Sequence, residues 1–167
     1  SQILLWDGQS IRNISFSGEV HPNYNPKIYD GRVVWSGYSY ESNNLEIFYF
    51  DGQITRQITN NEYDDISPKI YGDEITWSGF DGGDYEIFLF NTTDHSFQRI
   101  TDNNYHDGLP EIYRGKIAWQ AEPRKPIQQI FFFDGSKVFQ LTSHQSYSGF
   151  APKLDDTGVV WSGWDGQ

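Results

Sequence analysis

The stretch "EITWSGFDGGDYEIFLF" (residues 74–90) decides the fold class, because related stretches recur along the chain. They are "RVVWSGYSYESNNLEIFYF" (32–50), "KIAWQAEPRKPIQQIFFF" (116–133) and "GVVWSGWDGQ" (158–167). Two residue series keep one step of 42 positions: Trp35, Trp77, Trp119 and Trp161, and Pro26, Pro68, Pro110 and Pro152. A fixed period between about 20 and 50 residues indicates a repeat architecture.

Each repeat has the pattern of β-strands. After every Pro of the series comes a short apolar stretch, then a Gly-containing turn, and then an apolar run that ends in the Trp. A third run, such as "EIFYF" (46–50) or "EIFLF" (86–90), is followed by a turn, usually Asp-Gly, and by a fourth run that ends in Ile-Thr or a close variant. β-branched and aromatic runs between such turns are typical of antiparallel strands. We find no amphipathic helix, so the sequence predicts an all-β chain of four-stranded units.

Four-stranded antiparallel units of this length predict β-propeller blades. With strands a to d counted outward from the axis, residues 2–15 supply only strands c and d, and residues 152–163 supply only strands a and b. We therefore expect a single domain, 1–167, of four blades: 26–59, 68–101, 110–142, and 152–167 completed by 1–15. Around the joined ends, Pro152 and Pro26 are 41 positions apart. This spacing predicts that C-terminal strands a and b pair with N-terminal strands c and d.

The repeat resembles that of TolB-like (PD40-type) β-propellers, most clearly in "DISPKIYGDEITWSGFDGGDYEIFLFN…RIT" (65–101). The resemblance extends along nearly the whole chain. It departs from the family after the Pro, where members have "SPDG" and this chain has "KIYDG", "KIYGD" or "EIYRG". Members commonly have six or more blades, whereas this chain holds four. The resemblance implies a module of the cell surface or periplasm, and the family's peptidases carry catalysis on a separate domain.

Net charge, Cys content and the lack of known motifs argue against several classes of function. The net charge of −11 argues against nucleic acid, whose phosphates require Lys and Arg patches. The absence of Cys excludes disulfides, thiol catalysis and Cys-type zinc sites. No apolar run is long enough for a membrane span. No Gly-x-Ser-x-Gly elbow or other catalytic set is present, so we expect a protein that is not an enzyme.

Two groups of acidic or amide residues are better explained by a structural role than by catalysis or metal binding. Asp81-Gly82-Gly83-Asp84 lies between two predicted strands, and Asp-Gly marks turns strongly, so we expect a hairpin turn in preference to a calcium loop. Strand c opens with Glu or Gln in every repeat, one residue per blade, and we expect these residues to face solvent. They are Gln2, Glu46, Glu86 and Gln129.

The connections between strand d and the next strand a offer a candidate cation site. Asn23, Asp65, Asp107 and Gly149 each stand three residues before a Pro of the series. In a propeller such residues can face one another around the axis, so Asn23, Asp65 and Asp107 could hold Ca²⁺, another cation or water at the channel mouth. The alternative is turn capping by Asp.

Aromatic residues offer a candidate ligand site. The series Trp35, Trp77, Trp119 and Trp161 is expected to pack between blades. Exposed rings beside polar turns can stack on the C–H face of a sugar. The candidates are Tyr38, Phe80 and Trp164, three residues after Trp35, Trp77 and Trp161, together with Tyr63 and Tyr105 in the connections; Glu122 stands at this position after Trp119. Packing between blades is the alternative for Tyr38, Phe80 and Trp164.

Two function classes remain open on the sequence. The first is a ligand-binding module, lectin-like, with a carbohydrate ligand; the second is a protein-interaction scaffold of the cell surface or periplasm. A closed four-bladed monomer is favoured, because a hairpin pairs most readily with its own chain. A homodimer that forms an eight-bladed ring by exchanging halves is the alternative.

Overall fold

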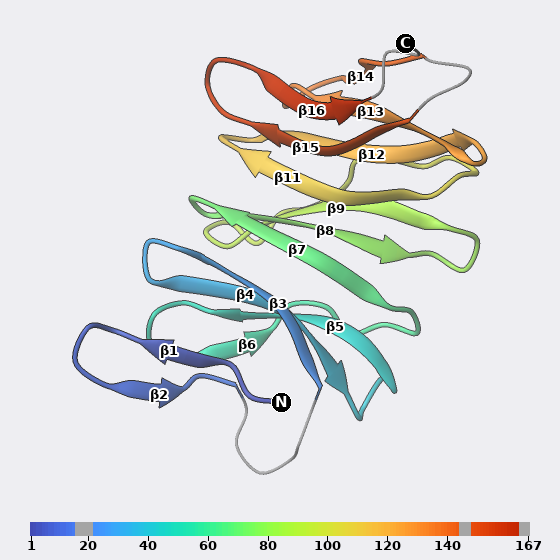
Figure 1. Ribbon diagram of the computed structural model, residues 1–167. Helices are drawn as coiled ribbons and strands as arrows, with labels where there is room; N and C mark the ends of the chain where they lie inside the picture. Colours follow the sequence, from blue (N-terminus) through green and yellow to red (C-terminus); the bar gives the residue numbers. More distant parts are fainter. Residues whose placement is uncertain (16–21, 144–147, 164–167) are drawn as a thin grey trace.

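A computed structural model describes residues 1–15, 22–143 and 148–163, and every regular element in these ranges is a β-strand. Three four-stranded antiparallel sheets follow one another as blades (Figure 1). The first contains β3 (Asn23–Tyr29), β4 (Arg32–Ser39), β5 (Asn44–Phe50) and β6 (Thr55–Gln57). The second contains β7 (Asp65–Tyr71), β8 (Glu74–Phe80), β9 (Tyr85–Asn91) and β10 (Phe97–Arg99). The third contains β11 (Asp107–Tyr113), β12 (Lys116–Arg124), β13 (Ile127–Phe133) and β14 (Val138–Gln140). The prediction of four-stranded propeller blades is confirmed.

The first strand of each blade starts earlier than the sequence predicts. It begins three residues before the Pro, so Asn23, Asp65 and Asp107 open strands rather than lying in connecting loops. The pairing with the second strand shifts register across the Pro in every blade, and the residue just before the Pro has positive φ, as at Ser67 (φ 56°). A β-bulge of this kind accommodates Pro, which has no N–H to donate to the ladder.

The core lies between successive blades. Trp35, Trp77 and Trp119 are at most 1% exposed, and each lies opposite a Phe of the neighbouring strand, 5.8–6.0 Å between ring centroids. Each Trp faces the preceding blade: Trp77, for example, packs in one cluster with Val34 and Ile47 of the first blade. These three Trp residues therefore form the inter-blade core that the sequence predicts.

The fourth blade is split. β1 (Leu4–Trp6) and β2 (Ile11–Asn13) form one two-stranded sheet, and β15 (Gly149–Leu154) and β16 (Val159–Gly163) form another. The N-terminal hairpin packs against the first blade through Ile3 and Ile14, and β15 lies against β12 and β13. Figure 1 shows the two hairpins at opposite ends of the row of blades. The predicted pairing of C-terminal strands a and b with N-terminal strands c and d is therefore wrong for this structure, because the row of blades stays open and leaves the two halves at its opposite ends.

The fourth Trp of the series differs from the others for the same reason. Trp161 is 37% exposed, whereas the prediction placed it in the core. In the complete blades the third strand supplies the Phe that stacks on the Trp. No such strand pairs with β16 within the described residues, and the ring of Trp161 stays partly uncovered.

Along the axis, charged residues of the innermost strands connect neighbouring blades. Lys69 on β7 and Lys153 on β15 both form ion pairs with Glu111 on β11. The described part of the chain contains no helix that could cross a membrane.

Candidate functional site

A cleft of about 550 Å³ lies between the first and second blades. Its apolar lining comes mainly from the second blade, where Trp77, Phe88 and Phe97 pack together with ring centroids 5.4–5.8 Å apart. Residues 58–63, at the end of the first blade and in the connection that follows, supply the other side. The cleft thus lies between the face of the second blade that carries Trp77 and the end of the first blade.

Two of the predicted ligand-binding residues meet at this cleft. Tyr63, from the connection, and Phe80, from the end of β8, both line it, with ring centroids 5.6 Å apart in an edge-to-face arrangement. Tyr63 is 39% exposed. Its hydroxyl lies over Gly82, where an added Cβ would come within 2.8 Å of it. Gly82 has φ +99°, a conformation that Gly adopts without strain, so the hairpin loop lets Tyr63 lie across it.

The first blade has a smaller counterpart of about 100 Å³, lined by Trp35, Tyr38, Tyr40 and Phe48. The ring of Tyr38 lies 5.3 Å from that of Tyr40, edge to face. Tyr40 is more exposed than Tyr38. The aromatic position three residues after Trp therefore lines a cleft in each of these two blades.

The third blade departs from this arrangement. Tyr105, the counterpart of Tyr63, packs against the core cluster of Trp119, and its ring lies 6.2 Å from that of Phe131. The position of Phe80 is Glu122 here, so Tyr105 has no ring at that position to lie against. Trp164, the remaining candidate, lies outside the described residues. The structure thus brings Tyr63 and Phe80 together and separates them from Tyr105.

Asp65 and Asp107 belong to buried hydrogen-bond networks within their own blades. The Trp77 indole N–H donates to Asp65 (2.8 Å) and the Trp119 N–H donates to Asp107 (2.6 Å). The other carboxylate oxygen of each accepts from the side-chain amide of an Asn four residues earlier. Burial raises the pKa of both carboxyl groups to about 7. In the first blade Asn23 takes this place and accepts from Trp35 (3.0 Å). The axial cation at these positions stays a prediction.

The Glu or Gln that opens the third strand is buried, which corrects the prediction that it faces solvent. Glu46 and Glu86 are 0% exposed, and Gln129 is 2% exposed. Thr59 Oγ1 donates to Glu46 (2.6 Å), and the backbone N–H of Asn61 donates to the other oxygen of Glu46 (2.9 Å). This side chain therefore holds the end of the outer strand and the start of the connection. The recurring Ile-Thr or Leu-Thr ending supplies the Thr partner of this side chain, and it was the feature of the sequence that could have indicated the burial.

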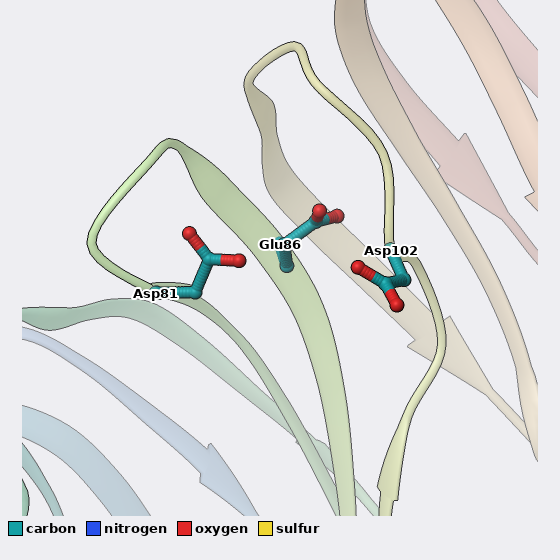
Figure 2. A group of neighbouring side chains, drawn as sticks. All are labelled: Asp81, Glu86 and Asp102. Carbon is teal, nitrogen blue, oxygen red and sulfur yellow. The ribbon is translucent and has the colours of Figure 1, made fainter.

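Asp81, Glu86 and Asp102 are the one group of three or more potential metal ligands found among the described residues. Figure 2 shows them gathered from the hairpin loop, strand β9 and the segment after β10. The Arg99 guanidinium contacts all three, at 2.6, 3.1 and 2.9 Å, so it supplies the positive charge that such a cluster requires.

The hairpin interpretation of Asp81–Asp84 is confirmed. The Asp81 N–H donates to the Asp84 carbonyl (3.0 Å), and an Asp81 carboxylate oxygen accepts from the N–H groups of Gly83 and Asp84. These bonds close the turn between β8 and β9 and hold the pKa of Asp81 below its usual value.

Comparisons with known proteins place the fold. No protein-family model and no curated protein matches the chain. The similar solved structures include a protein described as TolB from Agrobacterium tumefaciens, TolB from Acinetobacter baumannii, and the β-propeller domain of the Trilobed protease from Pyrococcus furiosus, which has an open velcro topology. Their identities are 20%, 17% and 17%, and their TM-scores are 0.62, 0.63 and 0.66. The matches with the A. tumefaciens, A. baumannii and P. furiosus structures cover 81%, 93% and 85% of this chain, respectively, and 51%, 40% and 45% of those chains. The fold is that of TolB-like β-propellers, and this chain spans about half of such a structure or less.

Proposed function

We propose that this chain is a non-catalytic binding module whose ligand enters the cleft between the first and second blades. The observation that carries the proposal is the meeting of Tyr63 and Phe80 at the mouth of a cleft of about 550 Å³. Binding sites are typically concave and largely apolar, with a few polar groups that orient the ligand. Here Asn61, Asp65 and Asp81 are the polar groups beside the rings.

A carbohydrate is the ligand class that fits this combination best. The C–H face of a sugar stacks on an aromatic ring, and its hydroxyl groups donate to carboxylate and amide oxygens. Asp81 and Glu62 line the cleft, and the chain carries a net charge of −11. This charge favours neutral or amino sugars over sulfated or phosphorylated ones.

A glycan array, followed by titration of the best sugar against the intrinsic fluorescence of the protein, tests the proposal. Trp77 lines the cleft, so a bound sugar is expected to change this fluorescence. We expect Tyr63→Ala and Phe80→Ala each to weaken binding about tenfold, which corresponds to roughly 1.4 kcal/mol. Phe139→Ala is the matched control, because Phe139 is an exposed aromatic residue on β14, away from the cleft, and it is expected to bind like wild type.

Either of two results would contradict the carbohydrate proposal: no sugar on the array binds, or Tyr63→Ala and Phe80→Ala bind as tightly as Phe139→Ala. The alternative is a protein-interaction scaffold of the cell surface or periplasm. It is favoured by the large apolar side chains exposed on the outer strand of the third blade, Val138 and Phe139. It predicts a protein partner whose binding is unchanged by Tyr63→Ala.

A further inference from the structure

Two strand edges of the structure lack partners among the described strands. β16 pairs only with β15, and β1 pairs only with β2. Large apolar side chains are exposed along both edges: Leu4 is 59%, Trp6 68% and Val160 66% exposed. Unpaired edges with apolar side chains are rare in folded proteins, because they present free N–H and C=O groups that recruit another strand.

The two edges are complementary in the register of the repeat. In every complete blade the Trp of the second strand lies opposite the Phe of the third: Trp35 opposite Phe48, Trp77 opposite Phe88, and Trp119 opposite Phe131. The same register would place Trp161 of β16 opposite Leu4 of β1. The neighbouring pairs would then be Val160 with Leu5 and Val159 with Trp6, so each pair is apolar on both strands.

The space beside β16 also fits the missing strand. At Gly37 and Gly79 an added Cβ would meet the ring of the third-strand Phe at 2.9 and 2.8 Å, and it would come closer still to the side chain of Asn23 or Asp65 on the first strand, so both neighbouring strands crowd this position. Gly163 is their counterpart in β16. Its added Cβ would meet nothing closer than 3.6 Å, and that nearest contact is Trp161 of the same strand. In β15 the counterpart of Asn23 and Asp65 is Gly149, so among the described residues no side chain of a neighbouring strand covers Gly163, and a third strand has room there.

The N-terminal hairpin keeps the polar contact that is typical of the outer half of a complete blade. In a complete blade the N–H of Ile47 donates to Thr59 Oγ1 (2.9 Å), next to Glu46. In the N-terminal hairpin the N–H of Ile3 donates to Ser15 Oγ (3.3 Å), next to Gln2. Residues 1–15 therefore carry the outer half of a blade in its usual internal bonding, and β15–β16 carry the inner half.

We propose that β16 of one copy of this chain pairs antiparallel with β1 of a second copy, and that the reciprocal contact closes a two-fold symmetric ring of eight blades. A second copy is the partner, because the two hairpins of one chain lie at opposite ends of the row of blades and do not pair with each other (Figure 1). Two copies contribute six complete blades and two composite ones, and no edge of this kind remains open. This inference does not rest on the proposed function, since it uses none of the cleft residues.

Solution mass and cysteine cross-linking test the proposal on the 167-residue chain. We expect light scattering to give about 39 kDa, twice the 19.4 kDa of one chain. The chain contains no Cys, so the double variant Leu5→Cys with Val160→Cys reports the pairing cleanly. In the proposed register these two residues lie directly opposite, and mild oxidation is expected to give a covalent dimer on a non-reducing gel.

The matched control is Leu4→Cys with Val160→Cys. Successive strand residues point to opposite faces of a sheet, so this pair should not cross-link if the register is correct. Val160 is exposed in the single chain, so Val160→Lys should leave the fold intact but place a charge in the proposed contact between copies. The mass is therefore expected to fall to 19.4 kDa. Ile54→Lys, at an exposed apolar position in the turn between β5 and β6, is not part of either open strand and should leave the mass at about 39 kDa.

Three results would overturn the proposal. A mass of 19.4 kDa for the unmodified chain at every concentration would show that a second copy does not cover the edges. A cross-link that stays within one chain would show closure of a single copy. A cross-link in the control pair that equals that of the test pair would show that the register is wrong.

Discussion

Removal of the Trp77 side chain probes the core between the first two blades. Trp77 is 1% exposed, its ring stacks on Phe88 with centroids 5.8 Å apart, and its indole N–H donates to Asp65 (2.8 Å). Truncation of a buried Trp to Ala costs about 3–5 kcal/mol through lost apolar contacts and the cavity left behind. We therefore expect Trp77→Ala to lower the free energy of unfolding by about this amount.

The variant Trp77→Phe separates the hydrogen bond from the packing. Phe keeps an aromatic ring in the site but removes the donor to Asp65. Loss of one partner of a buried polar group costs about 1–3 kcal/mol. The Trp77 donor lowers the pKa of Asp65, which burial raises to about 7. Without that donor the charged carboxylate is less stable in the folded protein, so the loss should be larger above pH 7 than at pH 5.

Denaturant unfolding at pH 5 and at pH 8.5 measures both effects. Phe97→Ala is the control, because Phe97 packs against Trp77 with centroids 5.7 Å apart but is 59% exposed. It is expected to cost about 1 kcal/mol or less, as for other largely exposed positions. Equal losses for Trp77→Ala and Phe97→Ala would refute the assignment of Trp77 to the core. A loss in Trp77→Phe that is the same at both pH values would refute the role given to its hydrogen bond.

Three further predictions concern the charged groups. The pKa values of Asp65 and Asp107 are raised from 3.8 to about 7 in the folded protein, so the folded state binds their protons more tightly and stability falls as pH rises from about 4 to about 7. The double variant Asp65→Asn with Asp107→Asn should flatten this fall in unfolding experiments across that range. Arg99→Met leaves the buried carboxylate of Glu86 without its ion pair and is expected to cost about 3 kcal/mol, measured by thermal unfolding; a loss below 1 kcal/mol would show that Arg99 does not neutralise the cluster. If Asn23, Asp65 and Asp107 hold an axial cation, millimolar calcium should raise the melting temperature, and Asp65→Ala with Asp107→Ala should abolish the increase; an unchanged melting temperature in wild type would rule the cation out.

The period of the repeat determined most of the fold. A step of 42 residues in two independent series, with strand-like runs between turns, predicted four-stranded blades and placed Trp35, Trp77 and Trp119 between them. These inferences succeed because they depend on local patterns. Strand alternation, Asp-Gly turns and a large apolar residue at a fixed position have the same consequence in every repeat.

The candidate site was predictable only in part. The aromatic character of Tyr63 and Phe80 could be read from the sequence, but their meeting at one cleft depends on how one blade packs on the next. The burial of Glu46 and Glu86 was missed, because a charged residue at a strand end usually faces water. In this fold the Thr that ends the outer strand and the backbone of the next connection satisfy the carboxylate of Glu46.

The sequence by itself determined the repeat, the four strands of each blade and the complementary character of its two halves. Only the tertiary structure decided where those halves lie. Strand register is a local property, since each residue faces its partner at a fixed distance along two neighbouring strands. Closure depends on the sum of the angles between all blades, and these angles are set by packing such as that of Trp77 against Val34. In this structure that sum leaves β1–β2 and β15–β16 apart. The sequence pattern of one repeat does not specify this sum, so closure could not be predicted from the sequence.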